Sequence, residues 1–134
     1  MLLCGDLNEA ASECLLSAGT EKSFLSDVVK IAHHGSADFS IDFLKEVSPY
    51  ASIISSGDNE SYSHPRADAI GCCGKYGRGE KPFVFSTELA RSYSKKKLLF
   101  GMINLRTDGN RLVIAQMKEK RTGADIWDSY ILPK

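Results

Sequence analysis

The stretch that decides the fold is "DVVKIAHHGSADFS", residues 27–40. The β-branched and apolar residues over 27–32 predict a buried strand, and Gly35-Ser36 predicts a turn directly after it. Two of the chain's three histidines, His33 and His34, stand where the strand meets that turn. Loops at the carboxyl ends of strands form the ligand-binding edge of open α/β sheets. This placement therefore indicates a functional site.

Outward from this stretch, predicted strands and helices alternate. Helices are expected after caps at Asn8 and Ser40, and a third is expected to begin at Pro65 and to run to about Tyr76. The predicted strands between them share short apolar runs, at residues 1–4, 27–32, 50–55 and 81–86. A helical turn at 87–93 follows the last of these.

The pattern changes from residue 98 onward. Two apolar runs, 98–105 and 112–117, flank a turn around Asp108-Gly109-Asn110 and predict a β-hairpin. A last strand is expected at 125–132. The whole order predicts an α/β protein with antiparallel additions at its C-terminal end.

Composition limits the classes of function. The 134 residues, 43% of them hydrophobic, suit one globular domain, and 17 basic against 17 acidic side chains give no global field for a polyanion or a membrane. Lys95, Lys96 and Lys97 form a local basic cluster that reads as a solvated turn. No run of about 18–20 apolar residues and no leader is found, so the chain is expected to be cytoplasmic, without a membrane.

The four cysteines are irregularly spaced, which predicts reduced thiols rather than a zinc knuckle. Of these, Cys4 and Cys14 are expected to be buried.

Polar groups of one kind follow three of the predicted strands: Asp6, then His33 and His34, then His64. Imidazole nitrogens and a carboxylate are a ligand set suited to zinc, iron or manganese. The alternative interpretation is plainer. Histidines at strand ends are commonly hydrogen-bonded surface groups, and an Asp after Gly is commonly a turn residue.

Three stretches together resemble a known family: "LLCGDLNEAASECLL" (2–16), "DVVKIAHHGSADFSIDFLKEVSP" (27–49) and "ASIISSGDNESYSHPRADAI" (51–70). They are similar to the metallo-β-lactamase-fold hydrolase domain of the ComEC type of competence DNA-uptake protein and its free-standing relatives. The spacing also matches, with 27 positions from Asp6 to His33 and 31 from His33 to His64. "LRTDGNRLVI" (105–114) looks like that family's terminal hairpin.

The resemblance implies a metal-dependent hydrolase acting on phosphodiester or related ester bonds, with two zinc ions per complete site and manganese as the alternative. It implies that Asp6 bridges or ligates the metals and that the histidine pair supplies a ligand, with His33 preferred and His34 beside it. His64 would line the same pocket. The expected metal and catalytic set is therefore Asp6, His33, His34 and His64, supported by Ser36 and Asn59.

One departure from the family is serious. Its main metal motif, His-x-His-x-Asp-His, is absent from these residues, and in the family it precedes the Gly-Asp motif. The chain is therefore expected to form one partial domain, 1–134, the C-terminal half of an αββα sandwich with a mixed sheet, flanking helices and a terminal hairpin. Zinc binding by this half alone is expected to be weak or absent.

Half a sandwich should expose an apolar face that favours association with a complementing N-terminal half or a second copy. The alternative function is accordingly a non-catalytic, truncated or complementing fragment that acts by binding another chain. A nucleic acid or another phosphodiester remains the expected substrate of the enzymatic interpretation.

Overall fold

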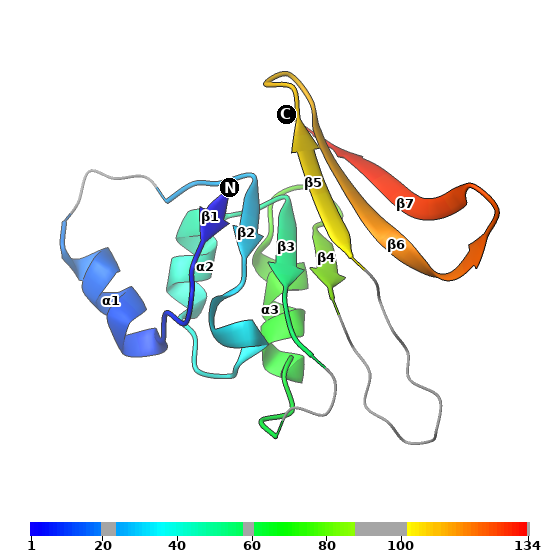
Figure 1. The fold of residues 1–134 in the computed structure, drawn as a ribbon. Helices are drawn as coiled ribbons and strands as arrows, with labels where there is room; N and C mark the ends of the chain where they lie inside the picture. Colours follow the sequence, from blue (N-terminus) through cyan, green and yellow to red (C-terminus); the bar gives the residue numbers. More distant parts are fainter. Residues whose placement is uncertain (20–23, 58–60, 88–101, 134) are drawn as a thin grey trace.

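The computed structural model describes residues 1–19, 24–57, 61–87 and 102–133, except for the side chains of 119–122. It confirms the predicted α/β class, with a parallel sheet, flanking helices and C-terminal antiparallel strands (Figure 1). The strands form two sheets. The predicted helical turn at 87–93 and the lysine cluster at 95–97 lie outside the described residues.

The first sheet has four parallel strands in the order β1-β2-β3-β4. Its elements alternate in the predicted order: β1 (Leu2–Leu3), α1 (Glu9–Ser17), β2 (Val28–Lys30), α2 (Ile41–Val47), β3 (Ala51–Ile54), α3 (Ala67–Tyr76) and β4 (Phe83–Ser86). Figure 1 shows α2 and α3 behind this sheet and α1 beside its β1 edge. Apolar residues of β2, β3, α2 and α3, among them Val29, Ile54, Val47 and Cys73, form the core between the helices and the sheet.

Local signals in the sequence explain where the helices begin. The Asn8 side chain accepts a hydrogen bond from the Ala11 amide at 2.9 Å, and the Ser40 hydroxyl accepts one from the Phe43 amide at 3.2 Å. Each cap satisfies an amide that lacks a partner within its helix. Both predicted caps are confirmed.

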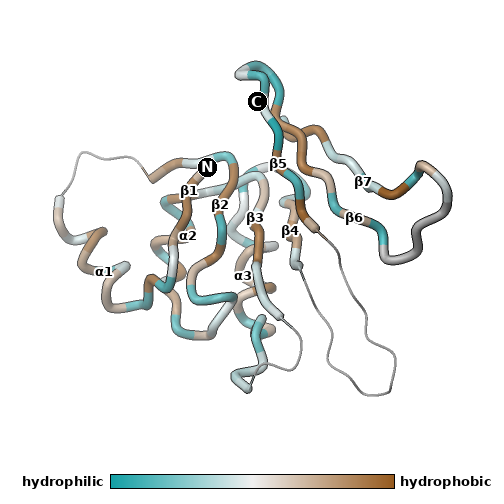
Figure 2. Tube along the Cα trace, in the orientation of Figure 1, coloured by the Kyte–Doolittle hydropathy of each residue, from teal (hydrophilic) through white to brown (hydrophobic). Residues whose placement is uncertain are grey.

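The second sheet is antiparallel, in the order β5-β6-β7, with strands β5 (Ile103–Thr107), β6 (Leu112–Thr122) and β7 (Asp125–Leu132). The carboxylate of Asp108 accepts hydrogen bonds from the amides of Asn110 and Arg111, which closes the predicted turn. Figure 2 shows the tip of this hairpin as hydrophilic and the strands of the parallel sheet as largely hydrophobic.

The antiparallel sheet packs on the face of the parallel sheet that the helices leave free. Ile114 and Leu132, both almost fully buried, share a core with residues of the parallel sheet: Val28, Ala51, Ile53 and Phe85. The Tyr130 ring lies 5.3 Å from that of Phe83 and 5.5 Å from that of Phe85, measured between centroids. A second core therefore joins the two sheets.

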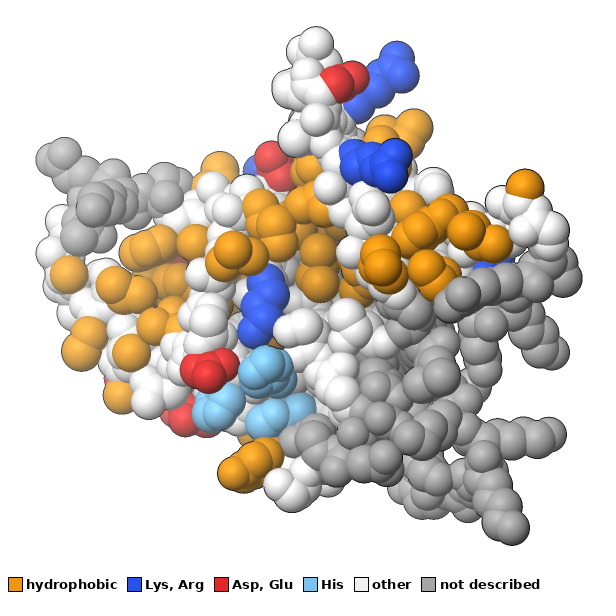
Figure 3. Space-filling model, viewed as in Figure 1, with side chains coloured by type: hydrophobic (Ala, Val, Ile, Leu, Met, Phe, Trp, Pro, Cys, Tyr) orange, Lys and Arg blue, Asp and Glu red, His pale blue; other side chains and the backbone are white. Residues whose placement is uncertain are grey.

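Part of the apolar surface stays open. Leu3 is 70% exposed on the edge strand β1, and Ile131 is 69% exposed on β7. In the view of Figure 3, hydrophobic side chains gather on the visible surface of the molecule over both sheets. Within the described residues, no helix is long and apolar enough to cross a membrane.

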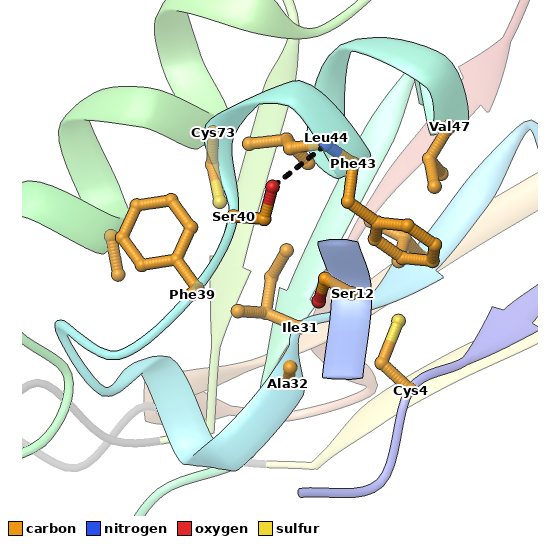
Figure 4. Close-up of a pocket in the computed structure, with 12 residues that line it drawn as sticks. Cys4, Ser12, Ile31, Ala32, Phe39, Ser40, Phe43, Leu44, Val47 and Cys73 are labelled. Atoms are coloured by element: carbon orange, nitrogen blue, oxygen red, sulfur yellow. Dashed lines mark hydrogen bonds between the residues drawn. The ribbon is translucent and has the colours of Figure 1, made fainter. Parts of the chain in front are cut away.

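A cavity of about 30 Å³ lies between the helices and the parallel sheet, lined by Cys4, Ser12, Phe39 and Cys73 among others (Figure 4). This volume is on the order of one water molecule, too small for a substrate. Burial raises the pKa of the Cys73 thiol to about 11. All four cysteines are free, as expected, but Cys14 is exposed rather than buried because it lies on the outer side of α1.

Candidate functional site

Three loops leave the parallel sheet at the same edge, after β1, β2 and β3. Because these strands are parallel, their carboxyl ends lie side by side, and residues far apart in the sequence meet there. The loops line a pocket of about 320 Å³ whose residues are Asp6, His33, His34, Ser56, Gly57, Tyr62 and His64. In Figure 3 the three histidines gather beside acidic side chains. The structure thus brings together the acidic group and the imidazoles that the sequence pointed to.

A left-handed turn presents the histidine pair. His33, His34 and Gly35 have φ angles of +48°, +54° and +80°, a conformation that side chains rarely adopt. The His33 amide donates to the Gly5 carbonyl at 2.9 Å, and the Gly35 carbonyl accepts from the Arg66 amide at 2.8 Å. The turn therefore ties the β1 loop and the start of α3 to the β2 loop.

Gly35 is required in this turn because of its positive φ and also because a side chain would not fit. A Cβ at this position would lie 2.8 Å from the Pro65 Cβ and 3.2 Å from a methyl carbon of Ile54. The close approach brings the loop that carries His64 against the histidine pair. Sequence reasoning identified the glycine as a turn residue, and the structure adds its role in packing.

His34 is oriented by a backbone carbonyl. Its Nδ1 lies 2.7 Å from the Ser55 carbonyl oxygen, which only accepts, so Nδ1 carries the proton and the neutral ring keeps its lone pair on Nε2. Nε2 lies 3.6 Å from Oδ1 of Asp6, and the two side chains are 51% and 68% exposed. The distance is too long for a hydrogen bond.

The same distance suits two ligands of one metal ion. Zinc bonds of about 2.0–2.2 Å at tetrahedral angles place two donor atoms about 3.4 Å apart. Asp6 Oδ1 and His34 Nε2, at 3.6 Å, have nearly this spacing. The geometry therefore favours His34 as the nitrogen donor next to Asp6, whereas the sequence led us to prefer His33.

His33 and His64 lie deeper in the same pocket. Their rings meet edge to face, with centroids 5.8 Å apart, and the His64 ring stacks on Tyr62 at 5.8 Å and 23°. The Nδ1 of His33 is buried and has no hydrogen-bond partner among the described residues. A buried nitrogen without a partner is costly and is explained most simply by a ligand or water that completes it.

The donors do not form a ready metal centre. Within residues 1–19, 24–57, 61–87 and 102–133, no three His, Cys, Asp or Glu side chains lie close enough together to hold a metal ion. Two donors, from Asp6 and His34, lie 3.6 Å apart, close to the spacing of two ligands of one zinc ion. The residues thus fit part of a metal site.

Of the two residues expected to support the site, Ser36 and Asn59, only Ser36 lies within the described residues. The Ser36 hydroxyl accepts from the Asp38 amide at 3.1 Å, and the Ser36 amide donates to the His33 carbonyl at 2.9 Å, so Ser36 stabilises the turn and does not line the pocket. Asn59 lies outside the described residues.

Sequence reasoning assigned no role to several contributors. Tyr62, Ser56 and Gly57 line the pocket and stand inside the stretch 51–70 that carries the family resemblance. The Ser55 carbonyl gave no signal at all, because every residue has a carbonyl.

Comparison with known proteins gives one partial similarity. Part of the chain is 32% identical over 70 residues to ComE operon protein 3 of Bacillus subtilis (strain 168). The aligned part covers 52% of this chain and 9% of that protein's length. No family model and no solved structure matches the chain.

Proposed function

We propose that this chain carries the C-terminal part of a metallo-β-lactamase-like hydrolase site that acts on phosphodiester or related ester bonds. The observation that carries the proposal is the pair formed by Asp6 and His34. Their donor atoms stand at the spacing of two zinc ligands, in a pocket that His33 and His64 also line.

The residues have distinct roles in this proposal. Asp6 and His34 would hold zinc, with manganese as the alternative, and the Ser55 carbonyl accepts from Nδ1 of His34, which leaves Nε2 available as the donor atom. His33 and His64 line the wall toward which an ester would bind. When bound, the metal would supply Lewis-acid activation of the ester and of water.

The remaining ligands would come from a chain that carries His-x-His-x-Asp-His. The proposal includes such a complementing half because two donors are fewer than the three protein ligands of catalytic zinc sites. The partial similarity to ComE operon protein 3 supports a competence-related role, in line with the resemblance of the sequence motifs to the ComEC type. The alignment spans only 9% of that protein, so its activity as a whole is carried over only within this proposal.

The alternative is a fragment that works by binding another chain and has no catalysis of its own. The open apolar surface favours it, because Leu3 and Ile131 are each about 70% exposed and β1 is an edge strand. Exposed apolar patches and unpaired strand edges both promote association.

Zinc binding by the 134-residue chain together with a chain that supplies His-x-His-x-Asp-His tests the proposal. We expect Asp6→Ala and His34→Ala each to weaken binding at least about tenfold, as measured by isothermal titration, because each removes one of the two placed donors. Asp42→Ala is the matched control, since this carboxylate pairs with Lys45 at 2.7 Å and lies outside the pocket.

Two outcomes would count against it. Equal zinc affinity for the Asp6→Ala and Asp42→Ala variants would remove Asp6 from the site. Absence of zinc binding together with self-association in sedimentation would favour the binding fragment. With a chain supplying the missing motif, Asp6→Ala should also abolish hydrolysis of bis(p-nitrophenyl) phosphate.

A further inference from the structure

Tyr62 is the most exposed large apolar side chain in the described part of the molecule, at 73%. It belongs to the loop between β3 and α3 and lines the pocket together with Asp6 and His34. One face of its ring stacks on His64, with centroids 5.8 Å apart and planes inclined by 23°. An aromatic ring is therefore fixed at the opening of the pocket.

A structural role accounts for only part of this arrangement. Stacking on His64 explains why the ring is held, but a residue that served only to pack would bury more of its surface. Gly57 lines the same pocket, and no atom of the described residues lies within 4 Å of the position that a Cβ would take there. Within this part of the chain, room for a flat group therefore remains in the pocket that Tyr62 lines.

We propose that Tyr62 is a specificity-determining residue that selects esters carrying a planar ring, such as a nucleobase, next to the phosphodiester. The ring would stack at the mouth while the ester faces the pair formed by Asp6 and His34. Stacking on an aromatic side chain tolerates any base, because every base has a π-face. The inference rests on the proposed function, whose ester it makes more specific.

Two probes that differ only in the bases test the inference. One is a thymidine tetranucleotide, and the other is the same backbone with abasic tetrahydrofuran residues. Both are titrated into the 134-residue chain by isothermal titration, with and without zinc. We expect the base-containing probe to bind about tenfold more tightly, in line with the usual contribution of one stacked base.

Three variants separate recognition from packing. Tyr62→Phe should keep the preference for the base-containing probe. Tyr62→Leu, which retains an apolar group beside His64, should bind the two probes with about equal affinity. Leu3→Ala is the control, because Leu3 is equally exposed but lies outside the pocket. It should leave the preference unchanged. Thermal unfolding of each variant verifies that the fold is kept.

Several results would overturn the inference. These are equal affinity of the unmodified chain for the two probes, no binding of either, or an unchanged preference in Tyr62→Leu. A loss of affinity for both probes alike in Tyr62→Leu would also overturn it, because Tyr62 would then only order His64. A base preference that does not depend on zinc, in a chain whose zinc affinity Asp6→Ala leaves unchanged, would support the ring site and refute the metal site.

Discussion

The two sheets of this molecule have different structural roles. The parallel sheet has strands of two to four residues, and the residues that line the pocket with the three histidines all follow the carboxyl ends of its strands. The antiparallel sheet has strands of five to eleven residues, and it contributes buried side chains to the joint between the sheets. Short parallel strands bring distant loops to one edge, whereas antiparallel strands joined by tight turns mainly cover a face.

Two glycines in turns, Gly35 after β2 and Gly109 between β5 and β6, give the test of this difference with the largest expected effect on stability. Gly35 and Gly109 have nearly the same φ, +80° and +88°, but a Cβ at Gly35 would meet Pro65 at 2.8 Å and one at Gly109 would meet nothing within 4 Å. Gly35→Ala should lower the free energy of unfolding by about 2–5 kcal/mol, from strain and overpacking together. Gly109→Ala should cost about 1–2 kcal/mol, from strain alone.

Denaturant unfolding of both variants measures the two values. Equal losses would mean that Pro65 yields to the added methyl group, and the close contact between the His64 loop and the histidine pair would then not be needed for stability.

The core that joins the two sheets gives the next largest expected loss of stability. Ile114 is fully buried against residues of both sheets, so Ile114→Ala should lower the free energy of unfolding by about 2–5 kcal/mol. Its neighbour Val113 points to the other face of β6 and is only partly buried, so Val113→Ala should cost less. If both variants unfold equally easily, the second core does not hold the sheets together, and the two halves of the molecule are better treated separately.

Much of the fold could be predicted from the sequence because its signals are local. Apolar runs marked the strands, Asn8 and Ser40 marked two helix starts, and Asp108-Gly109-Asn110 marked the hairpin turn. The convergence of Asp6 with the histidines also followed, since parallel strands share an edge. That these residues bind metal stays a prediction.

The rest depends on contacts between distant segments. The choice of His34 over His33 next to Asp6 comes from the Ser55 carbonyl, 21 positions further along the chain. Nor did the sequence reveal that the strands split into two sheets, because strand pairing depends on packing across the whole chain.

Alkaline pH should weaken the core between the helices and the parallel sheet, because the Cys73 thiol is buried there. Burial raises the pKa of Cys73 from 9.0 to about 11, and the thiol is 1% exposed. Above about pH 9 the unfolded chain releases this proton while the folded chain keeps it, so stability is complete below pH 9 and falls as the pH rises toward 11. The loss amounts to about 2–3 kcal/mol.

Cys73→Ala isolates this contribution. Lysines and tyrosines titrate in both proteins, so the difference between the two curves of unfolding free energy against pH belongs to Cys73. We expect the variant to start lower at pH 7, because a buried group is lost, and then to fall less steeply between pH 9 and 11. Cys14→Ala should follow the unmodified chain, since that thiol is exposed. Parallel curves for Cys73→Ala and the unmodified chain would mean that the thiol can ionise within the fold, and that the core between helices and sheet admits water more readily than its close packing indicates.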